Sequence, residues 1–248
     1  MPAIFKGLNT NKSFLVVRPN PLTGFKLEWN DIANTPFATH TDLNSFINGN
    51  GGAANYTSVE VVGNVQTFYG GTAVNLGDSF MDGNDNIVSI RDDAFQVVAQ
   101  GNGGQSTCAI LETIALPALI TQLGNCQNGN PALTSLNLQA MTAQGKSCQS
   151  SNDTLLSISL PSLTTQTGEN QSDNPALLNF TANALTSQTD NNQINNPLLT
   201  TITTPALTSI GTGNYVGCTY GIMTINVDAS LFGAADILTA QAGGATII

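Results

Sequence analysis

The sequence predicts a mainly β protein: a parallel β-solenoid built from 22-residue repeats and preceded by a small N-terminal attachment segment. Two observations predict this fold. Apolar residues recur every 22 residues over five consecutive repeats, and only 9 % of the 248 residues are charged. Asn, Gln, Ser and Thr replace the missing charges. Identical neutral side chains can stack along a solenoid, whereas columns of like charges would repel.

The repeat has the form L-x-x-[IL]-x-L-x-x-L. Each copy predicts a short alternating strand whose apolar residues point into the solenoid. Strands of successive coils would then stack in parallel at about 4.8 Å. Because one coil cannot bury its apolar side alone, neighbouring coils must stabilise each other. The predicted repeat core consists of Leu111, Ile114, Leu116, Leu133, Leu136, Leu138, Leu155, Ile158, Leu160, Leu177, Phe180, Leu199 and Ile202.

Amide side chains keep the same register and form three further columns. Gln recurs at one position in four repeats and again five residues later, and Asn recurs three residues before the leading Leu. We favour buried amide ladders, because an amide both donates and accepts hydrogen bonds. A solvated face and a polar ligand-binding strip remain the alternatives. The columns are Gln122, Gln144, Gln166 and Gln188; Gln127, Gln149, Gln171 and Gln193; and Asn130, Asn152, Asn174 and Asn196.

Three regions follow from these patterns. Residues 1–52 form the attachment and oligomerisation segment, which ends in a Gly-rich linker over residues 48–55. Residues 53–228 form the solenoid, opened by two cap strands within 59–76, and residues 229–248 form a C-terminal cap with a short helix. The attachment segment should be separable at the linker. Its expected contact residues are Trp29, Phe37, Leu43 and Phe46.

Charge and composition exclude several function classes. Residues 1–57 carry four basic and three acidic residues, whereas the remainder carries two basic and thirteen acidic residues, so the solenoid is acidic. Nucleic-acid binding needs a basic surface, which this body lacks. The start of the chain shows no signal peptide, and no apolar run is long enough to span a membrane. We expect neither nucleic acid nor membrane as a partner.

No constellation in the sequence indicates catalysis. His40 has no Ser or Cys partner nearby, and Asp92 with Asp93 reads as a solvated turn. The loop that starts at Asp82 faintly resembles a calcium loop, but Ile87 occupies the position that needs glycine. Cys126 and Cys148 fall in one column and could bridge, although a reduced pair is the simpler interpretation. We therefore expect no enzyme activity, no cofactor and no metal.

The segment Leu207-Thr-Ser-Ile210-Gly211-Thr-Gly-Asn-Tyr-Val-Gly-Cys218 resembles the BspA-like branch of leucine-rich repeats, whose unit continues as L-x-x-I-G-x-x-A-F-x-x-C. The resemblance covers roughly residues 59–228 and implies a solenoid of the leucine-rich-repeat type. The chain departs from this branch at the Gln columns, where the family has apolar and aromatic residues. The interior of this solenoid should therefore be more polar.

Residues 1–57 are similar to N-terminal regions of phage fibre proteins, in the style of virion proteins of phages that infect Bacteroidetes, including the crAss-like group. The resemblance implies a tail- or head-fibre adhesin that is made in the host cytoplasm and becomes part of the virion. Its N-terminus would dock on other virion proteins, and its solenoid would face a host surface glycan or protein. By analogy it would be a homo-oligomer, a trimer. The alternatives are a capsid-decoration or spacer protein and a bacterial interaction or adhesion scaffold.

Overall fold

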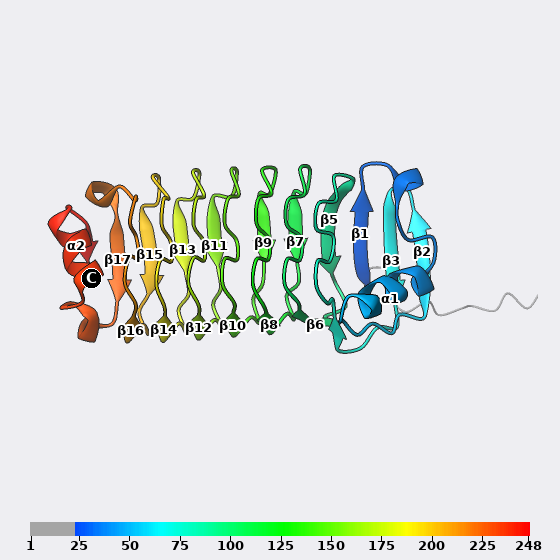
Figure 1. Ribbon diagram of the computed structural model, residues 1–248, viewed down its shortest axis with the longest axis horizontal. Coiled ribbons are helices and arrows are strands. Elements are labelled where there is room, and N and C mark those ends of the chain that lie inside the picture. Colours follow the sequence, from blue (N-terminus) through cyan, green and yellow to red (C-terminus); the bar gives the residue numbers. More distant parts are fainter. Residues whose placement is uncertain (1–22) are drawn as a thin grey trace, which may run out of the picture.

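The computed structural model describes residues 23–248. They form a parallel β-solenoid of about eight turns of roughly 22 residues, with 27 % strand and 12 % helix, which confirms the predicted fold class. Figure 1 shows the coils stacked side by side along the long axis, with a cap at each end.

Each coil contributes two short strands to two different sheets. The first strand of each coil, here called the lead strand, carries the central apolar residue of the L-x-x-[IL]-x-L pattern, such as Ile114. The second strand carries Gln122 or its equivalent in the other coils. Lead strands are β5 (Ile87–Asp92), β7 (Thr113–Ala115), β9 (Ser135–Asn137), β11 (Ser157–Ser159), β13 (Asn179–Thr181), β15 (Thr201–Thr204) and β17 (Thr224–Val227). Second strands are β4 (Val74–Asn75), β6 (Val97–Gln100), β8 (Thr121–Gln122), β10 (Ala143–Gln144), β12 (Thr165–Gln166), β14 (Ser187–Gln188) and β16 (Ser209–Ile210).

The central apolar residues of the lead strands stack in register. Ile114 pairs with Leu136, Ile158 with Phe180, and Phe180 with Ile202. Four of these five residues are at most 1 % exposed, and Leu136 is only partly buried. The other predicted repeat-core residues are all buried: Leu111, Leu116, Leu133, Leu138, Leu155, Leu160, Leu177 and Leu199.

The second strands form one continuous seven-stranded sheet, whereas the lead strands divide into two sheets. The first of these runs in the order β2-β3-β1-β5-β7-β9, and the other runs β11-β13-β15-β17-β18. The sequence pattern does not predict this division, because the leucine period continues through it.

The N-terminal cap shares a sheet with the first coils of the solenoid. Strand β1 (Phe25–Trp29) lies antiparallel between β3 (Val65–Tyr69) and β5, and β3 also pairs with β2 (Ser58–Val62). A 3-10 helix (Ile32–Asn34) and α1 (His40–Gly49) follow β1. The expected division at residue 52 therefore does not coincide with a structural boundary, because the described residues before it share sheet and core with the coils.

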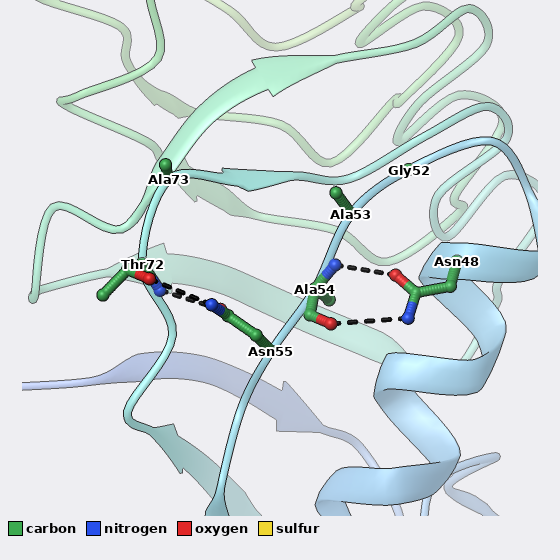
Figure 2. Close-up of a pocket in the computed structure, with 7 residues that line it drawn as sticks. All are labelled: Asn48, Gly52, Ala53, Ala54, Asn55, Thr72 and Ala73. Carbon is green, nitrogen blue, oxygen red and sulfur yellow. Dashed lines mark hydrogen bonds between the residues drawn. The ribbon is translucent and has the colours of Figure 1, made fainter.

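The Gly-rich segment is held by hydrogen bonds, which corrects the expectation of a flexible linker. The Ala54 amide donates to Asn48 Oδ1 at 2.7 Å, and the Thr72 amide donates to Asn55 Oδ1 at 2.9 Å (Figure 2). Gly52 lies against Asn75 and Gly77 so closely that a Cβ atom would clash. Glycine here reflects tight packing and not mobility.

The return arc that closes each coil alternates between left-handed and other backbone conformations. In one coil Asn191, Gln193 and Asn195 have φ angles of 58°, 54° and 53°. Left-handed geometry costs an ordinary side chain about 1 kcal/mol or more, and Asn and Gly tolerate it best. Hydrogen bonds to neighbouring coils hold these residues in place. The Asn- and Gly-rich composition of the arcs follows from this backbone.

The C-terminal cap contains the expected short helix, α2 (Ala235–Ala242). A 3-10 helix (Tyr220–Ile222) precedes β17, and a second one (Ala229–Leu231) precedes α2. The chain ends with β18 (Thr246–Ile247), which pairs in parallel with β17. Asp236 of α2 accepts a hydrogen bond from the Asn214 amide at 2.8 Å. The cap thereby satisfies main-chain donors that the last coil would leave open.

Candidate functional site

The inner Gln column is a continuous ladder in the solenoid interior. Gln193 Nε2 donates to Gln171 Oε1 at 2.8 Å, Gln171 Nε2 to Gln149 Oε1 at 3.1 Å, and Gln149 Nε2 to Gln127 Oε1 at 2.7 Å. Gln127 Nε2 then donates to Gln105 Oε1 at 2.9 Å. All five side chains are fully buried. Gln105 was missed by the sequence analysis, although it lies 22 residues before Gln127.

The outer Gln column is also buried but is bonded less regularly. Gln144 Oε1 accepts from Gln171 Nε2 at 3.1 Å, and Gln166 Nε2 donates to Gln188 Oε1 at 3.1 Å. Gln122 differs, because neither its Oε1 nor its Nε2 has a hydrogen-bond partner among the described residues. Members of one sequence column therefore have different energetic roles.

The Asn column forms a second ladder that joins side chains to the main chain. The amides of Asn130, Asn152 and Asn174 donate to the side-chain oxygen one coil later at 2.9–3.0 Å. Each Asn Nδ2 also donates to the carbonyl of an inner-column Gln, as from Asn196 to Gln171 at 2.8 Å. Each Asn side chain in this column thus uses both its oxygen and its nitrogen in hydrogen bonds. The bond from Nδ2 to the Gln carbonyl also holds the left-handed Gln backbone in place.

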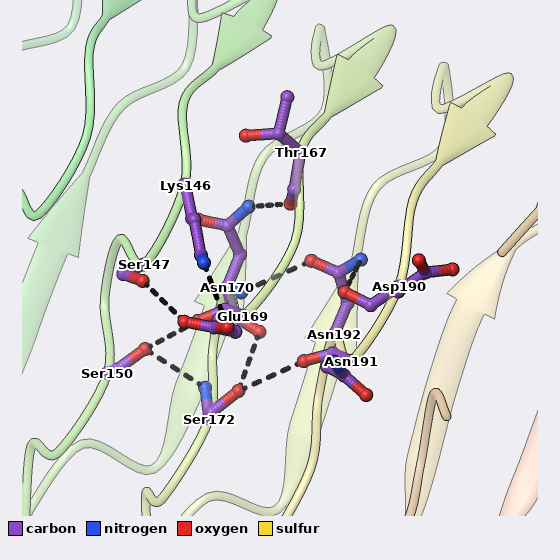
Figure 3. A network of polar contacts seen from close by, with 10 residues as sticks. All are labelled: Lys146, Ser147, Ser150, Thr167, Glu169, Asn170, Ser172, Asp190, Asn191 and Asn192. Carbon is purple, nitrogen blue, oxygen red and sulfur yellow. Dashed lines mark hydrogen bonds and ion pairs between the residues drawn. The ribbon is translucent and has the colours of Figure 1, made fainter. Parts of the chain in front are cut away.

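A further column, missed by the sequence analysis, runs from Cys148 through Asn170, Asn192 and Asn214 to Asp236. The Cys148 amide donates to Asn170 Oδ1 at 2.7 Å. The Asn170 amide donates to Asn192 Oδ1 at 3.2 Å, and Figure 3 shows these two asparagines. Three Asn residues at a spacing of 22 were a visible signal. The column is hard to recognise in the sequence because Cys148 and Asp236 replace Asn at its two ends.

The surface beside this column carries one small charged network. Lys146 Nζ lies 3.0 Å from Glu169 Oε1, and Ser147 Oγ donates to Glu169 Oε2 at 3.1 Å (Figure 3). The lysine interaction lowers the pKa of Glu169. Both charged side chains are largely exposed, so this pair contributes little to stability.

The four cysteines are free thiols that occupy ladder positions. Cys108 Sγ donates to the Met81 carbonyl at 2.8 Å, and Cys126 Sγ donates to the Gly101 carbonyl at 3.1 Å. Burial raises the pKa of Cys108 and of Cys218 to about 11. Protonated thiols are weak nucleophiles, so Cys108 and Cys218 act as structural donors.

Asp92 is buried, which corrects the interpretation of a solvated turn. It is 1 % exposed, its Oδ2 accepts from the Val97 amide at 2.7 Å, and its Oδ1 has no partner among the described residues. Asp93 is the member that pairs with Lys26, at 2.5 Å. Burial raises the pKa of Asp92 and, together with the charge of Asp92, that of Tyr56.

Replacing Asp92 by Asn should make unfolding less dependent on pH. A raised folded-state pKa means that Asp92 contributes its full stability below its unfolded pKa of about 4 and loses it as pH rises through the folded value. Asn keeps an acceptor for the Val97 amide but cannot ionise. Melting temperatures of both proteins between about pH 3 and pH 7 test this. Identical pH profiles would contradict a destabilising carboxylate.

Trp29, Phe37, Leu43 and Phe46 lie inside the N-terminal cap. The ring centroids of Trp29 and Phe37 are 6.3 Å apart, those of Phe37 and Phe46 are 5.4 Å apart, and Trp29 Nε1 donates to Gln66 Oε1 at 2.9 Å. Leu43 is fully buried. Trp29, Phe37 and Leu43 are therefore core residues and not exposed attachment contacts, and Phe46 packs against the same core while partly buried.

The outward side of the lead strands, here called the lead face, is a neutral array. From β7 to β17 these strands contain no charged residue. Their outward positions flank the central apolar residue and repeat in register from coil to coil. These positions hold Thr113, Ala115, Ser135, Asn137, Ser157, Ser159, Asn179, Thr181, Thr201, Thr203, Thr224 and Asn226.

Within residues 23–248, no group of three or more His, Cys, Asp or Glu side chains could hold a metal ion. Asn84 Oδ1, in the loop that resembled a calcium site, accepts from the amides of Asn86 and Ile87 at 2.9 and 3.0 Å. None of the described helices has the length and apolar character needed to cross a membrane. Comparison of the chain with protein-family models, curated proteins and solved structures finds no match.

Proposed function

We propose that the chain is a phage virion fibre component that docks through its N-terminal cap and projects the solenoid toward the host surface. The observation that carries this proposal is the stack of coils, whose lead face presents neutral hydroxyl or amide side chains at eleven of its twelve outward positions over six strands. Eight coils at about 4.8 Å make a rod roughly 40 Å long. The resemblance to BspA-like repeats and to fibre N-termini supports the same function.

The buried ladders suit a projecting element. Each inner Gln contacts the coils before and after it, so a single coil cannot open without breaking bonds in both neighbours. Stability is then cooperative along the axis, as in other repeat proteins. The lead strands from β7 to β17 carry no charge, so their stacked hydroxyl and amide side chains do not repel one another.

The lead face fits a neutral, hydroxyl-rich ligand such as a surface glycan. Ser, Thr and Asn side chains offer both donors and acceptors, and their repeat along the axis matches a polymer better than a single small molecule. The described lead strands beyond β5 present no aromatic side chain outward, because Phe180 points inward and is fully buried. This last observation favours the second candidate function, a spacer or capsid-decoration protein without a receptor.

Docking through the N-terminal cap requires surface other than its buried aromatic residues. Strand β2 is the outermost strand of its sheet, and Val61 and Val62 are 50 % and 69 % exposed. An exposed apolar strand at a sheet edge favours association with another chain. This edge is the proposed contact with other virion proteins or with further copies in a homo-oligomer.

Labelling of purified particles with an antibody against the solenoid tests the virion assignment. The proposal expects label at a defined position on intact particles, on the head for a decoration protein and on the tail for a tail fibre. Label confined to unassembled protein in the lysate would contradict the proposal.

Competition between purified protein and particles for adsorption to host cells tests the adhesive function. The protein should reduce adsorption, and lysines at Thr181 and Thr203 on the lead face should abolish the effect. Lysines at Thr165 and Ser187, on the outward side of the second strands, are the matched control and should leave competition intact. Equal behaviour of both variants would exclude the lead face, and no competition by the unaltered protein favours the spacer.

A further inference from the structure

The lead sheet is interrupted once, between β9 and β11. Every other pair of successive lead strands from β5 to β17 is joined in parallel register, but β9 and β11 belong to different sheets. In Figure 1 the two ribbons stand visibly apart. The second strands β10 and β12 of the same two coils remain paired, with Ala143 opposite Thr165 and Gln144 opposite Gln166.

The missing main-chain hydrogen bonds can be identified from the neighbouring coils. Leu116 N donates to the Asn137 carbonyl at 2.9 Å, but Leu138 N, one coil later, makes no corresponding bond. Leu178 N donates to the Leu156 carbonyl at 2.9 Å, but Leu156 N makes no bond to the preceding coil. At this junction, main-chain hydrogen bonds are therefore missing at both ends of the lead strand.

A local departure in sequence accompanies the interruption. The coils on either side begin with Pro-Ala at residues 131–132 and 175–176, whereas this coil begins with Asp153-Thr154. The Thr154 hydroxyl lies 2.9 Å from the carbonyl oxygens of both Pro131 and Leu133. An alanine cannot place a polar atom there, so the hydroxyl occupies the seam between the coils.

Packing is looser on the lead side of the seam. Leu136 is partly buried, whereas Ile114 and Ile158 beside it are 0 % and 1 % exposed. The Oδ1 atom of Asn137 is buried without a partner. A buried acceptor without a donor is costly, so the closed position of this seam gains less free energy than the other coil contacts.

We propose that this seam is a flexion joint at which the rod bends, while the continuous sheet of second strands keeps the two parts of the rod connected. The flanking contacts hold: Asn130 N donates to Asn152 Oδ1 at 3.0 Å, and Gln149 Nε2 donates to Gln127 Oε1 at 2.7 Å. Because these contacts hold the rest of the seam together, the two coils can separate only on the lead side, and the rod bends in that one direction. The two blocks, ending at β9 and beginning at β11, move as bodies and change the curvature of the lead face.

Amide hydrogen exchange of the full chain, read residue by residue by NMR, tests the joint. Leu138 N and Leu156 N should exchange at least about 100-fold faster than the bonded equivalents Leu116 N and Leu178 N, since local opening governs exchange. Equal protection of the two pairs would overturn the proposal.

Two variants test the cause of the joint. Thr154→Ala, alone or with Asp153→Pro, gives this coil the Ala or Pro-Ala of its neighbours and should slow the exchange of Leu138 and Leu156 toward the values of Leu116 and Leu178. Thr154→Ser keeps the hydroxyl and should leave both amides fast. Fast exchange in Thr154→Ala would overturn the assignment of the hydroxyl. If a variant fails to fold, the measurement on the unaltered chain still decides whether the joint exists.

Discussion

Replacing Ile158 by Asp is expected to unfold several coils and not one. Ile158 is 1 % exposed and stacks on Phe180, which in turn stacks on Ile202. Among the residues that the structure describes, no Lys or Arg is buried in the core, so a carboxylate at this position would be uncompensated, at a cost of roughly 3–5 kcal/mol or more. Because neighbouring coils depend on each other, amide protection should fall in the coils of β13 and β15 as well.

Two controls distinguish burial of the charge from other effects. Ser157→Asp places the same carboxylate outward on the same strand, where Ser157 is exposed, and should change stability by less than about 0.5 kcal/mol. Ile158→Val shortens the core side chain and should cost about 1 kcal/mol. Melting and hydrogen exchange measure all three variants. Loss of protection restricted to the mutated coil would contradict cooperative stacking.

The second large effect is expected for Gln171→Leu. Gln171 donates to Gln149 and Gln144 and accepts from Gln193 at 2.8 Å. Leucine would leave Gln193 Nε2 and Gln144 Oε1 buried without partners, because neither atom has another partner among residues 23–248. Each such loss costs about 1–3 kcal/mol, so the free energy of unfolding should fall by about 2–6 kcal/mol.

Gln122→Leu is the matched control for Gln171→Leu. Gln122 is also buried, at 3 % exposure, but its amide has no hydrogen-bond partner among the described residues. Removal of an unsatisfied amide should leave stability unchanged or raise it. Urea unfolding of both variants makes the comparison. Two equal losses of stability would mean that leucine is simply the wrong shape at these positions, and two neutral results would mean that the ladders contribute nothing.

The 22-residue period predicts much of this structure, because stacking in register is a property of the repeat itself. It places Ile114, Phe180 and Ile202 in one inward column and the Gln and Asn side chains in adjoining columns. It does not distinguish between members of a column. Whether Gln122 or Gln171 finds a partner depends on side-chain rotamers in three successive coils, which no spacing encodes.

The 22-residue period does not predict the structure of the N-terminal cap. Strand β1 pairs with β5 some sixty residues later, and the antiparallel register of Phe25 with Asp92 leaves no local trace in the sequence. The glycines at residues 48–55 look like a linker by composition, yet they permit close backbone packing. Similarly, a single hydroxyl at Thr154 accompanies the division of the lead sheet, against an unbroken leucine pattern.

The most direct test of the solenoid held by amide ladders is NMR of the side-chain amide protons of Gln171 and Gln193. The structure predicts slow exchange with solvent and nuclear Overhauser contacts from each amide to the Gln one coil away, since all inner-column side chains are fully buried. The exposed Gln139 is the internal reference and should exchange rapidly. Exchange of Gln171 and Gln193 as fast as that of Gln139, without contacts between coils, would contradict the ladder.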